Sequence, residues 1–94
     1  MNYRFILGEH GTWIEQAGDV ALLGGWAEVA LEEEFARRVD TADYEVFLSS
    51  YDAAVVFVQN RTSKGFEIHA MSAPGQRHHK TVQCAYRVVG RARS

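Results

Sequence analysis

The sequence predicts an all-β protein, a compact antiparallel β-sandwich of about six to eight short strands with one short helix at about residues 33–38. Residues 81–89 alternate between apolar and polar or small side chains, as in a strand with one buried face. Turn-forming residues also recur at short intervals, which is typical of antiparallel sheets rather than of strands that alternate with long helices. The apolar members of the alternating segment are Val82, Cys84, Tyr86 and Val88.

The length of 94 residues predicts a single domain over residues 1–94. Apolar residues make up 47% of the chain, an ordinary share for a globular protein. No apolar run reaches the roughly 18 residues of a membrane span, so we expect no membrane insertion. The first residues become charged too early for a signal peptide. We therefore expect a cytoplasmic protein or one domain of a longer exported or assembled protein.

The first half of the chain is expected to begin with two short strands and two turns. The strands are residues 3–7 and 12–15, the turns are residues 8–11 and 18–19, and the apolar residues 20–23 then lead into Gly24 and Gly25. Ala27, Val29 and Leu31 then alternate with polar residues as in a further strand, which leads into the helix. Acidic residues open this helix and two arginines close it, in keeping with the helix dipole. One continuous amphipathic helix over residues 27–39 is the alternative, since most of these residues are good helix formers.

The second half is expected to contain four strands joined by polar turns. The strands are residues 44–48, 53–58, 65–70 and 81–89, after a turn at residues 40–43. The connections are residues 49–52, 60–65 and 72–80, and Gly65 is expected to take a positive φ. Asn60 begins an Asn-Arg-Thr glycosylation pattern, which favours an exposed turn there.

The charge is unevenly distributed along the chain. Residues 1–47 carry ten acidic residues against three arginines, whereas residues 48–94 carry seven basic residues against two acidic ones. The simplest interpretation is that opposite charges meet across neighbouring strands, and complementarity between protomers is a second. A nucleic-acid face is a third, but the net charge of −2 argues against such a partner. That face would use Arg77, Lys80, Arg87, Arg91 and Arg93.

No residue set reaches the strength of a catalytic or metal-binding signature, so we expect no enzyme activity, cofactor or metal. The histidines lack the spacing of a zinc site, and Ser49, Ser50 and Asp52 lack the context of a hydrolase nucleophile. Residues 32–34, all glutamate, are expected to be a solvated helix start. The lone cysteine, Cys84, excludes an internal disulfide and is expected to be a small buried side chain.

The aromatic residues divide into an expected core and an expected surface. Trp26 and Tyr44 are assigned to the core, because a small domain uses most of its rings for packing. Tyr51, in a loop, is the ring expected to be exposed.

Five segments together resemble a small C-terminal β-domain of phage tail-fibre-like and related bacterial proteins and, more distantly, H-type lectin domains. They are residues 25–31, 34–36, 44–48, 62–68 and 86–91. The resemblance spans about residues 13–93, with departures at the two glutamates 32–33 and at the His78-His79 loop. It implies a homotrimeric, non-enzymatic module that registers three chains and binds a cell-surface glycan or protein, at a bacteriophage virion or cell surface.

By position, the loops at residues 49–52 and 76–80 are expected to bind the ligand. The candidate residues are Tyr51, Asp52, Arg77, His78 and His79. Two rival functions stay open. One is a cytoplasmic adaptor domain of the same fold that binds a protein, and the other is a small metal-dependent or hydrolytic enzyme that uses His69, His78 and His79.

Overall fold

A computed structural model describes residues 5–71 and 81–93, with side chains from Gly11 onward. Within these residues the chain forms seven strands and one short helix, which confirms the all-β sandwich. The elements are β1 (Phe5–His10), β2 (Trp13–Leu22), β3 (Trp26–Ala30), α1 (Glu33–Arg38), β4 (Val39–Ser50), β5 (Val55–Gln59), β6 (Gly65–Met71) and β7 (Val82–Ala92).

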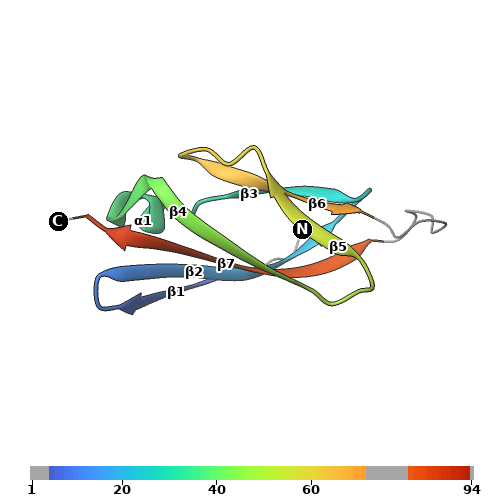
Figure 1. The fold of residues 1–94 in the computed structure, drawn as a ribbon. Coiled ribbons are helices and arrows are strands. Elements are labelled where there is room, and N and C mark those ends of the chain that lie inside the picture. The colour runs from blue at the N-terminus through green and yellow to red at the C-terminus, as the bar shows by residue number, and fades with distance from the viewer. Residues whose placement is uncertain (1–4, 72–80, 94) are drawn as a thin grey trace.

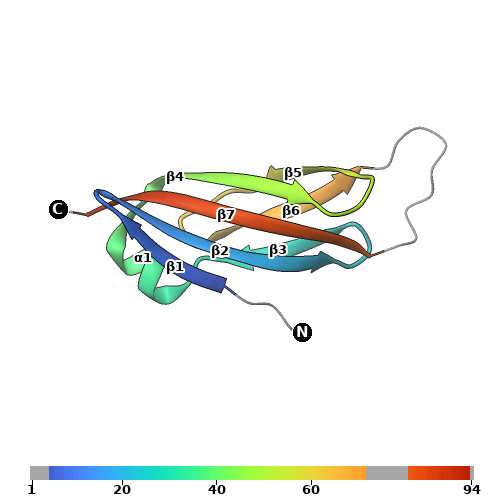
Figure 2. The same ribbon diagram turned by 90° about the horizontal axis from the view of Figure 1, so that it is seen from below.

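The strands form two antiparallel sheets that lie one above the other (Figure 1). The four-stranded sheet has the order β1-β2-β7-β4, and the three-stranded sheet has the order β3-β6-β5. The molecule is elongated, with extents of 49 × 22 × 20 Å. Figure 2 shows the four-stranded sheet from its outer side, with β7 between β2 and β4 and with α1 at one end of the sandwich.

The core lies between the sheets and is built on the alternation predicted for β7. The four residues of that strand predicted to face inward, Val82, Cys84, Tyr86 and Val88, are all buried, and Cys84 has no exposed surface. The two halves of the chain do interleave, because β2 and β4 from the first half pair with both sides of β7. The other buried apolar residues are Ile14, Val20, Leu22, Val29, Leu31, Phe35, Val39, Tyr44, Phe66 and Ile68.

The short helix follows a strand, so the alternative of one continuous helix is wrong. Phe35 is fully buried from α1, and the buried side chain of Gln16 ties the start of the helix to β2. The Gln16 amide oxygen accepts a hydrogen bond from the backbone N–H of Glu32 at 2.7 Å. Its amide nitrogen lies 3.4 Å from both the Ala30 carbonyl and the Tyr86 hydroxyl. A buried amide with its donors and acceptors satisfied in this way specifies one packing of helix on sheet.

Two predicted turns are wrong, because strands run through both. Residues 18–19 lie inside β2, where Gly18 pairs with Phe5 on one side and Tyr86 on the other. Residues 40–43 form an irregularity within β4, since the register against β7 shifts between Val39 and Tyr44. A bulge admits turn-forming residues without ending the strand, which the sequence pattern does not distinguish from a turn.

Gly65 is required for a different reason from the predicted one. The positive φ of the β5–β6 connection belongs to Asn60, at 52°, and not to Gly65. A Cβ atom on Gly65 would lie 2.3 Å from the backbone carbonyl oxygen of Val29. Glycine at this position therefore permits the close approach of β3 and β6.

Tyr44 fixes the β5–β6 hairpin against β4. Its hydroxyl lies 2.6 Å from the carbonyl oxygen of Thr62 and 2.9 Å from that of Gly65, and it can donate to either. Arg61 donates from its guanidinium to the Tyr44 carbonyl at 2.6 Å and lies over the Tyr44 ring. Burial raises the pKa of the Tyr44 phenol, although Arg61 and the hydrogen bond to Thr62 lower it.

Candidate functional site

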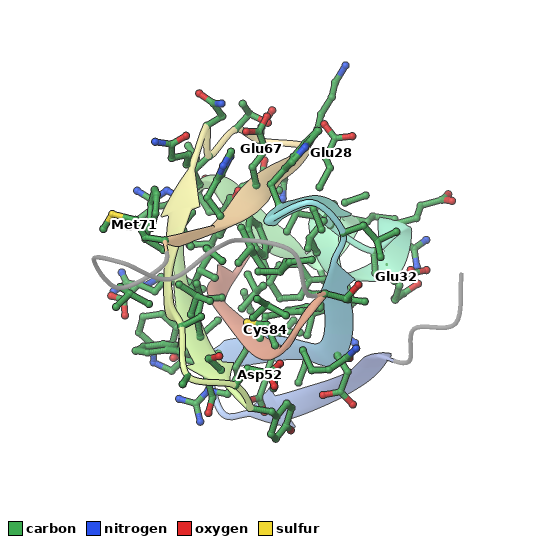
Figure 3. The ribbon with its side chains drawn as sticks, turned by 90° about the vertical axis from the view of Figure 1, so that its right-hand side faces the viewer. Glu28, Glu32, Asp52, Glu67, Met71 and Cys84 are labelled. Carbon is green, nitrogen blue, oxygen red and sulfur yellow. The ribbon has the colours of Figure 1, made fainter. Side chains whose placement is uncertain are left out.

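Two of the five predicted binding residues lie in the described part of the chain. Tyr51 is exposed over 67% of its surface, as predicted. Asp52 is also exposed, but its carboxylate accepts a 2.7 Å hydrogen bond from the backbone N–H of Gln83 and so anchors the loop to β7 (Figure 3). The other three, Arg77, His78 and His79, lie outside the described residues.

A different surface collects more binding chemistry than this loop, namely the outer face of the three-stranded sheet. Alternate residues of β3, β5 and β6 point away from the core, and their registers place them in rows across the three strands. We call this surface the β3-β6-β5 face. Its described residues are Trp26, Glu28, Ala30, Val55, Phe57, Gln59, Glu67, His69 and Met71.

The middle row of this face consists of three rings. His69 is directly opposite Trp26 on one side and Phe57 on the other. The centroid of its ring lies 5.8 Å from each neighbouring ring, and the planes differ by only 17° and 23°. Trp26 is 48% exposed, so its predicted place in the core is wrong, whereas Tyr44 is buried as predicted. Ala27 and Val29 point inward, and strand alternation therefore turns Trp26 outward.

The next row places two carboxylates opposite each other. Glu28 on β3 pairs in register with Glu67 on β6, and Figure 3 shows both side chains directed away from the sandwich. Oε1 of Glu67 lies 2.9 Å from the His69 ring nitrogen and accepts a 2.9 Å hydrogen bond from the Asn60 side chain. The hydrogen bonds from His69 and then Asn60 hold the pKa of Glu67 below its ordinary value. Within residues 11–71 and 81–93, no ion pair engages Glu28.

Beyond the carboxylates the face is hollowed. Ala30 and Gly65 have little or no side chain, and they adjoin a shallow depression of about 320 Å³. Glu28, Asn60 and Lys64 also line it. The depression offers a ligand both hydrogen-bond acceptors and hydrogen-bond donors.

At its opposite end the β3-β6-β5 face is apolar. Among the described residues, seven large hydrophobic side chains are exposed, and four of them gather here. Val55 and Met71 are opposite each other and are 60% and 54% exposed. Leu23 pairs with Trp26 across the two-residue turn of Gly24 and Gly25, and positive φ angles at both glycines suit this tight connection.

The outer face of the four-stranded sheet has aromatic residues too, and there an arginine of the same chain lies over each of two rings, although Trp13 and Phe47 remain 38% and 47% exposed. The guanidinium carbon of Arg91 lies 5.4 Å from the centre of the Trp13 ring, and that of Arg87 lies 5.0 Å from the centre of the Phe47 ring. Arg87 also pairs with Glu15 at 3.1 Å, which confirms that opposite charges of the two halves meet across strands.

Neither a metal site nor a membrane-spanning helix is present in the described part of the chain. No three histidine, cysteine or acidic side chains there are grouped so that they could hold an ion. The same residues contain no helix long and apolar enough to cross a membrane. His69, which the enzyme hypothesis would use, lies between two rings and pairs with Glu67.

Comparisons with protein-family models, with curated proteins and with solved structures find no match to this chain. The resemblance to tail-fibre-like domains therefore stays a prediction.

Proposed function

We propose that the protein is a non-enzymatic recognition module that binds a protein partner across the β3-β6-β5 face. The observation that carries this proposal is the concentration of exposed apolar side chains at one end of that face, next to charged residues. Soluble domains seldom expose a contiguous apolar area of this kind unless a partner covers it.

The composition of the face suits a protein interface. Tryptophan and methionine are enriched in interfaces, and tryptophan often contributes a large part of the binding energy. Trp26 and Met71 occupy neighbouring rows, and Glu28 and Glu67 form a polar border on one side. A partner that covered the rings would thus meet an apolar centre and a charged rim, as in known protein interfaces.

Selection of peptides that depend on Trp26 tests the proposal. A phage-displayed library of random 12-residue peptides is panned against the protein, and enriched clones are assayed against Trp26→Ala. Trp13→Ala is the matched control, because Trp13 is exposed to a similar extent on the other sheet. We expect clones that lose binding by about tenfold or more with Trp26→Ala and retain it with Trp13→Ala. Equal loss with both variants, or no enrichment, would overturn the proposal.

Glycan recognition is the second candidate, and the row of three rings beside the Glu67 carboxylate favours it. Sugars bind to aromatic rings through their apolar faces and to carboxylates and amides through their hydroxyl groups. A glycan array probed with the protein and with Trp26→Ala tests this candidate. Signals for neutral sugars that vanish with Trp26→Ala would support glycan binding. An array without signal would contradict it, and protein binding would then be the one candidate function of this face.

Assembly as a trimer is a prediction that follows from the resemblance to tail-fibre-like domains. Sedimentation velocity at micromolar protein concentration tests whether the protein forms a trimer. A single species at the 10.6 kDa of the monomer would contradict it.

A further inference from the structure

We propose that the partner contributes an arginine or lysine side chain that pairs with Glu28 and Glu67 and stacks on Trp26. This inference rests on the proposed function, because it specifies the chemistry of the partner at the β3-β6-β5 face. The partner segment is expected to be extended, with one basic residue over the carboxylates and apolar residues at the next alternate positions.

The other aromatic residues of the chain supply the first argument. Three of them, Trp13, Phe47 and Tyr44, each have a guanidinium of the same chain 5.0–5.4 Å from the ring centre. Such contacts stabilise by roughly 0.5–1 kcal/mol at exposed sites. Covering a ring with an arginine is thus a repeated feature of this protein.

On the β3-β6-β5 face no arginine of the described residues lies over a ring, and Lys64, which lines the depression with Glu28 and Glu67, forms no described ion pair with either carboxylate. Glu28 has no ion-pair partner there, and the contacts of Glu67 come from Asn60 and His69. Because Trp26 and Glu28 are two residues apart on β3, they lie on the same side of the sheet. A single cationic side chain could therefore contact the Trp26 ring and the Glu28 carboxylate at the same time.

Charge gives the second argument. Like charges directly opposite each other on neighbouring strands repel, and Glu28 and Glu67 are in this position. A cation placed between them would remove the repulsion and add charge-assisted hydrogen bonds. Since Glu67 is hydrogen-bonded as a carboxylate, it retains its negative charge at neutral pH.

The spacing between neighbouring rows of the face is the reason we expect the partner segment to be extended. Neighbouring rows of a sheet face are about 7 Å apart, which is also the distance between alternate residues of an extended chain. A segment that lies along β3 and β6 with an arginine over Glu28 would place its next alternate residue at the row of Trp26 and His69, beside the arginine side chain that stacks on Trp26. The following one would reach Met71 and Val55, which calls for an apolar side chain.

Three synthetic peptides test the inference by NMR titration of the 15N-labelled protein. The first has the sequence Leu-Ser-Leu-Ser-Arg-Ser with blocked ends, the second has citrulline in place of arginine, and the third has glutamate. Citrulline keeps the shape of arginine but carries no charge. We expect amide shifts on β3 and β6, and affinity about tenfold higher for the arginine peptide than for the citrulline peptide.

Substitutions of Glu28 and Glu67 test whether these two carboxylates cause the higher affinity for the arginine peptide. Glu28→Gln and Glu67→Gln together are expected to remove most of the difference between the arginine and citrulline peptides. Glu45→Gln is the control, because Glu45 is an exposed glutamate on β4 of the other sheet. It should leave the difference unchanged. Raising the salt concentration should weaken binding of the arginine peptide and not of the citrulline peptide.

The outcomes separate this inference from the proposed function. If both the arginine and citrulline peptides bind equally and both depend on Trp26, recognition stands and the cation inference is overturned. If no peptide shifts the β3 and β6 amides, both are overturned. A site already occupied by the chain's own Arg77 would appear as a change in Trp26 fluorescence on Arg77→Gln, measured in Trp13→Phe protein without peptide, and would also overturn the inference.

Discussion

The outer faces of both sheets contain exposed aromatic and charged residues, but the two faces differ in which charged residues lie next to the rings. On the four-stranded sheet Trp13 and Phe47 each have an arginine of β7 over the ring, and Arg87 is also paired with Glu15. On the three-stranded sheet Trp26 has a histidine beside it, and no arginine of the described residues pairs with the nearest two carboxylates. An exposed aromatic residue is therefore a stronger candidate for binding where no described arginine of the same chain lies over its ring.

The largest expected loss of stability comes from a substitution that disrupts the pairing of β3 with β6 in the three-stranded sheet. Gly65→Ala places a Cβ atom 2.3 Å from the Val29 carbonyl, and because the obstacle is backbone, β3 and β6 must separate. We expect a loss of about 3 kcal/mol in the free energy of unfolding, measured with urea. Gly90→Ala is the matched change in the four-stranded sheet. Its Cβ atom would meet the Cβ atom of the buried Val39 at 2.9 Å, so β4 must also shift, but the overlap is smaller than at Gly65 and a smaller loss is expected. An equal loss in both variants would contradict this difference between the sheets.

On the four-stranded sheet, removal of a covering arginine should weaken the fold. Arg87→Ala deletes the contact with Phe47 and the ion pair with Glu15, at a cost of about 1 kcal/mol because both groups are partly exposed to solvent. Arg91→Ala deletes only the described contact with Trp13 and should cost about half as much. Urea unfolding measures both, and unchanged stability of Arg87→Ala would show that the covered face is not stabilised by its arginines.

On the three-stranded sheet, removal of a charge should have the opposite sign. Glu28→Gln relieves the repulsion from Glu67 and should raise the free energy of unfolding by about 0.3 kcal/mol at low salt. The gain should vanish at 1 M salt, where surface charges are screened. Glu45→Gln is the control on the other sheet. If Glu28→Gln destabilises the protein, Glu28 has a partner and the comparison of the two faces fails.

The smallest effect concerns the titration of Glu67. Its pKa in the folded protein is lowered chiefly by the hydrogen bond from His69, so it favours folding at pH values above the ordinary glutamate pKa of 4.5. This contribution is lost as the pH falls from 4.5 through the lowered pKa. His69→Ala should return the pKa towards its ordinary value, and Asn60→Ala should do so to a lesser extent. Carboxyl 13C shifts measured against pH will detect both changes, and an unaltered titration in His69→Ala would refute the assignment.

Local patterns were sufficient to predict the main elements of the fold. The acidic residues at the start of the helix and the two arginines at its end predicted this element, and the alternation in residues 81–89 predicted the central strand with its inward face. Residues 18–19 were predicted to turn because glycine and aspartate favour turns, but pairing with β1 and β7 keeps them extended.

The candidate site was harder to predict, because it depends on strand register. Trp26, Phe57 and His69 are far apart in the sequence, and no local pattern brings them into one row. One signal was available, since the alternation that placed Ala27 and Val29 inward also placed Trp26 outward. The preference of large rings for the core outweighed it in the prediction.

Because Cys84 is buried, chemical modification of its thiol can be used to measure how often the core of the sandwich opens. The only thiol of the chain lies on the central strand with no exposed surface, and burial is the main cause that raises its pKa. A thiol reagent can therefore modify Cys84 only after the core that packs against this face of β7 has opened. The rate of modification then measures how often the sandwich opens, without any added label, and a partner bound to the β3-β6-β5 face should slow it.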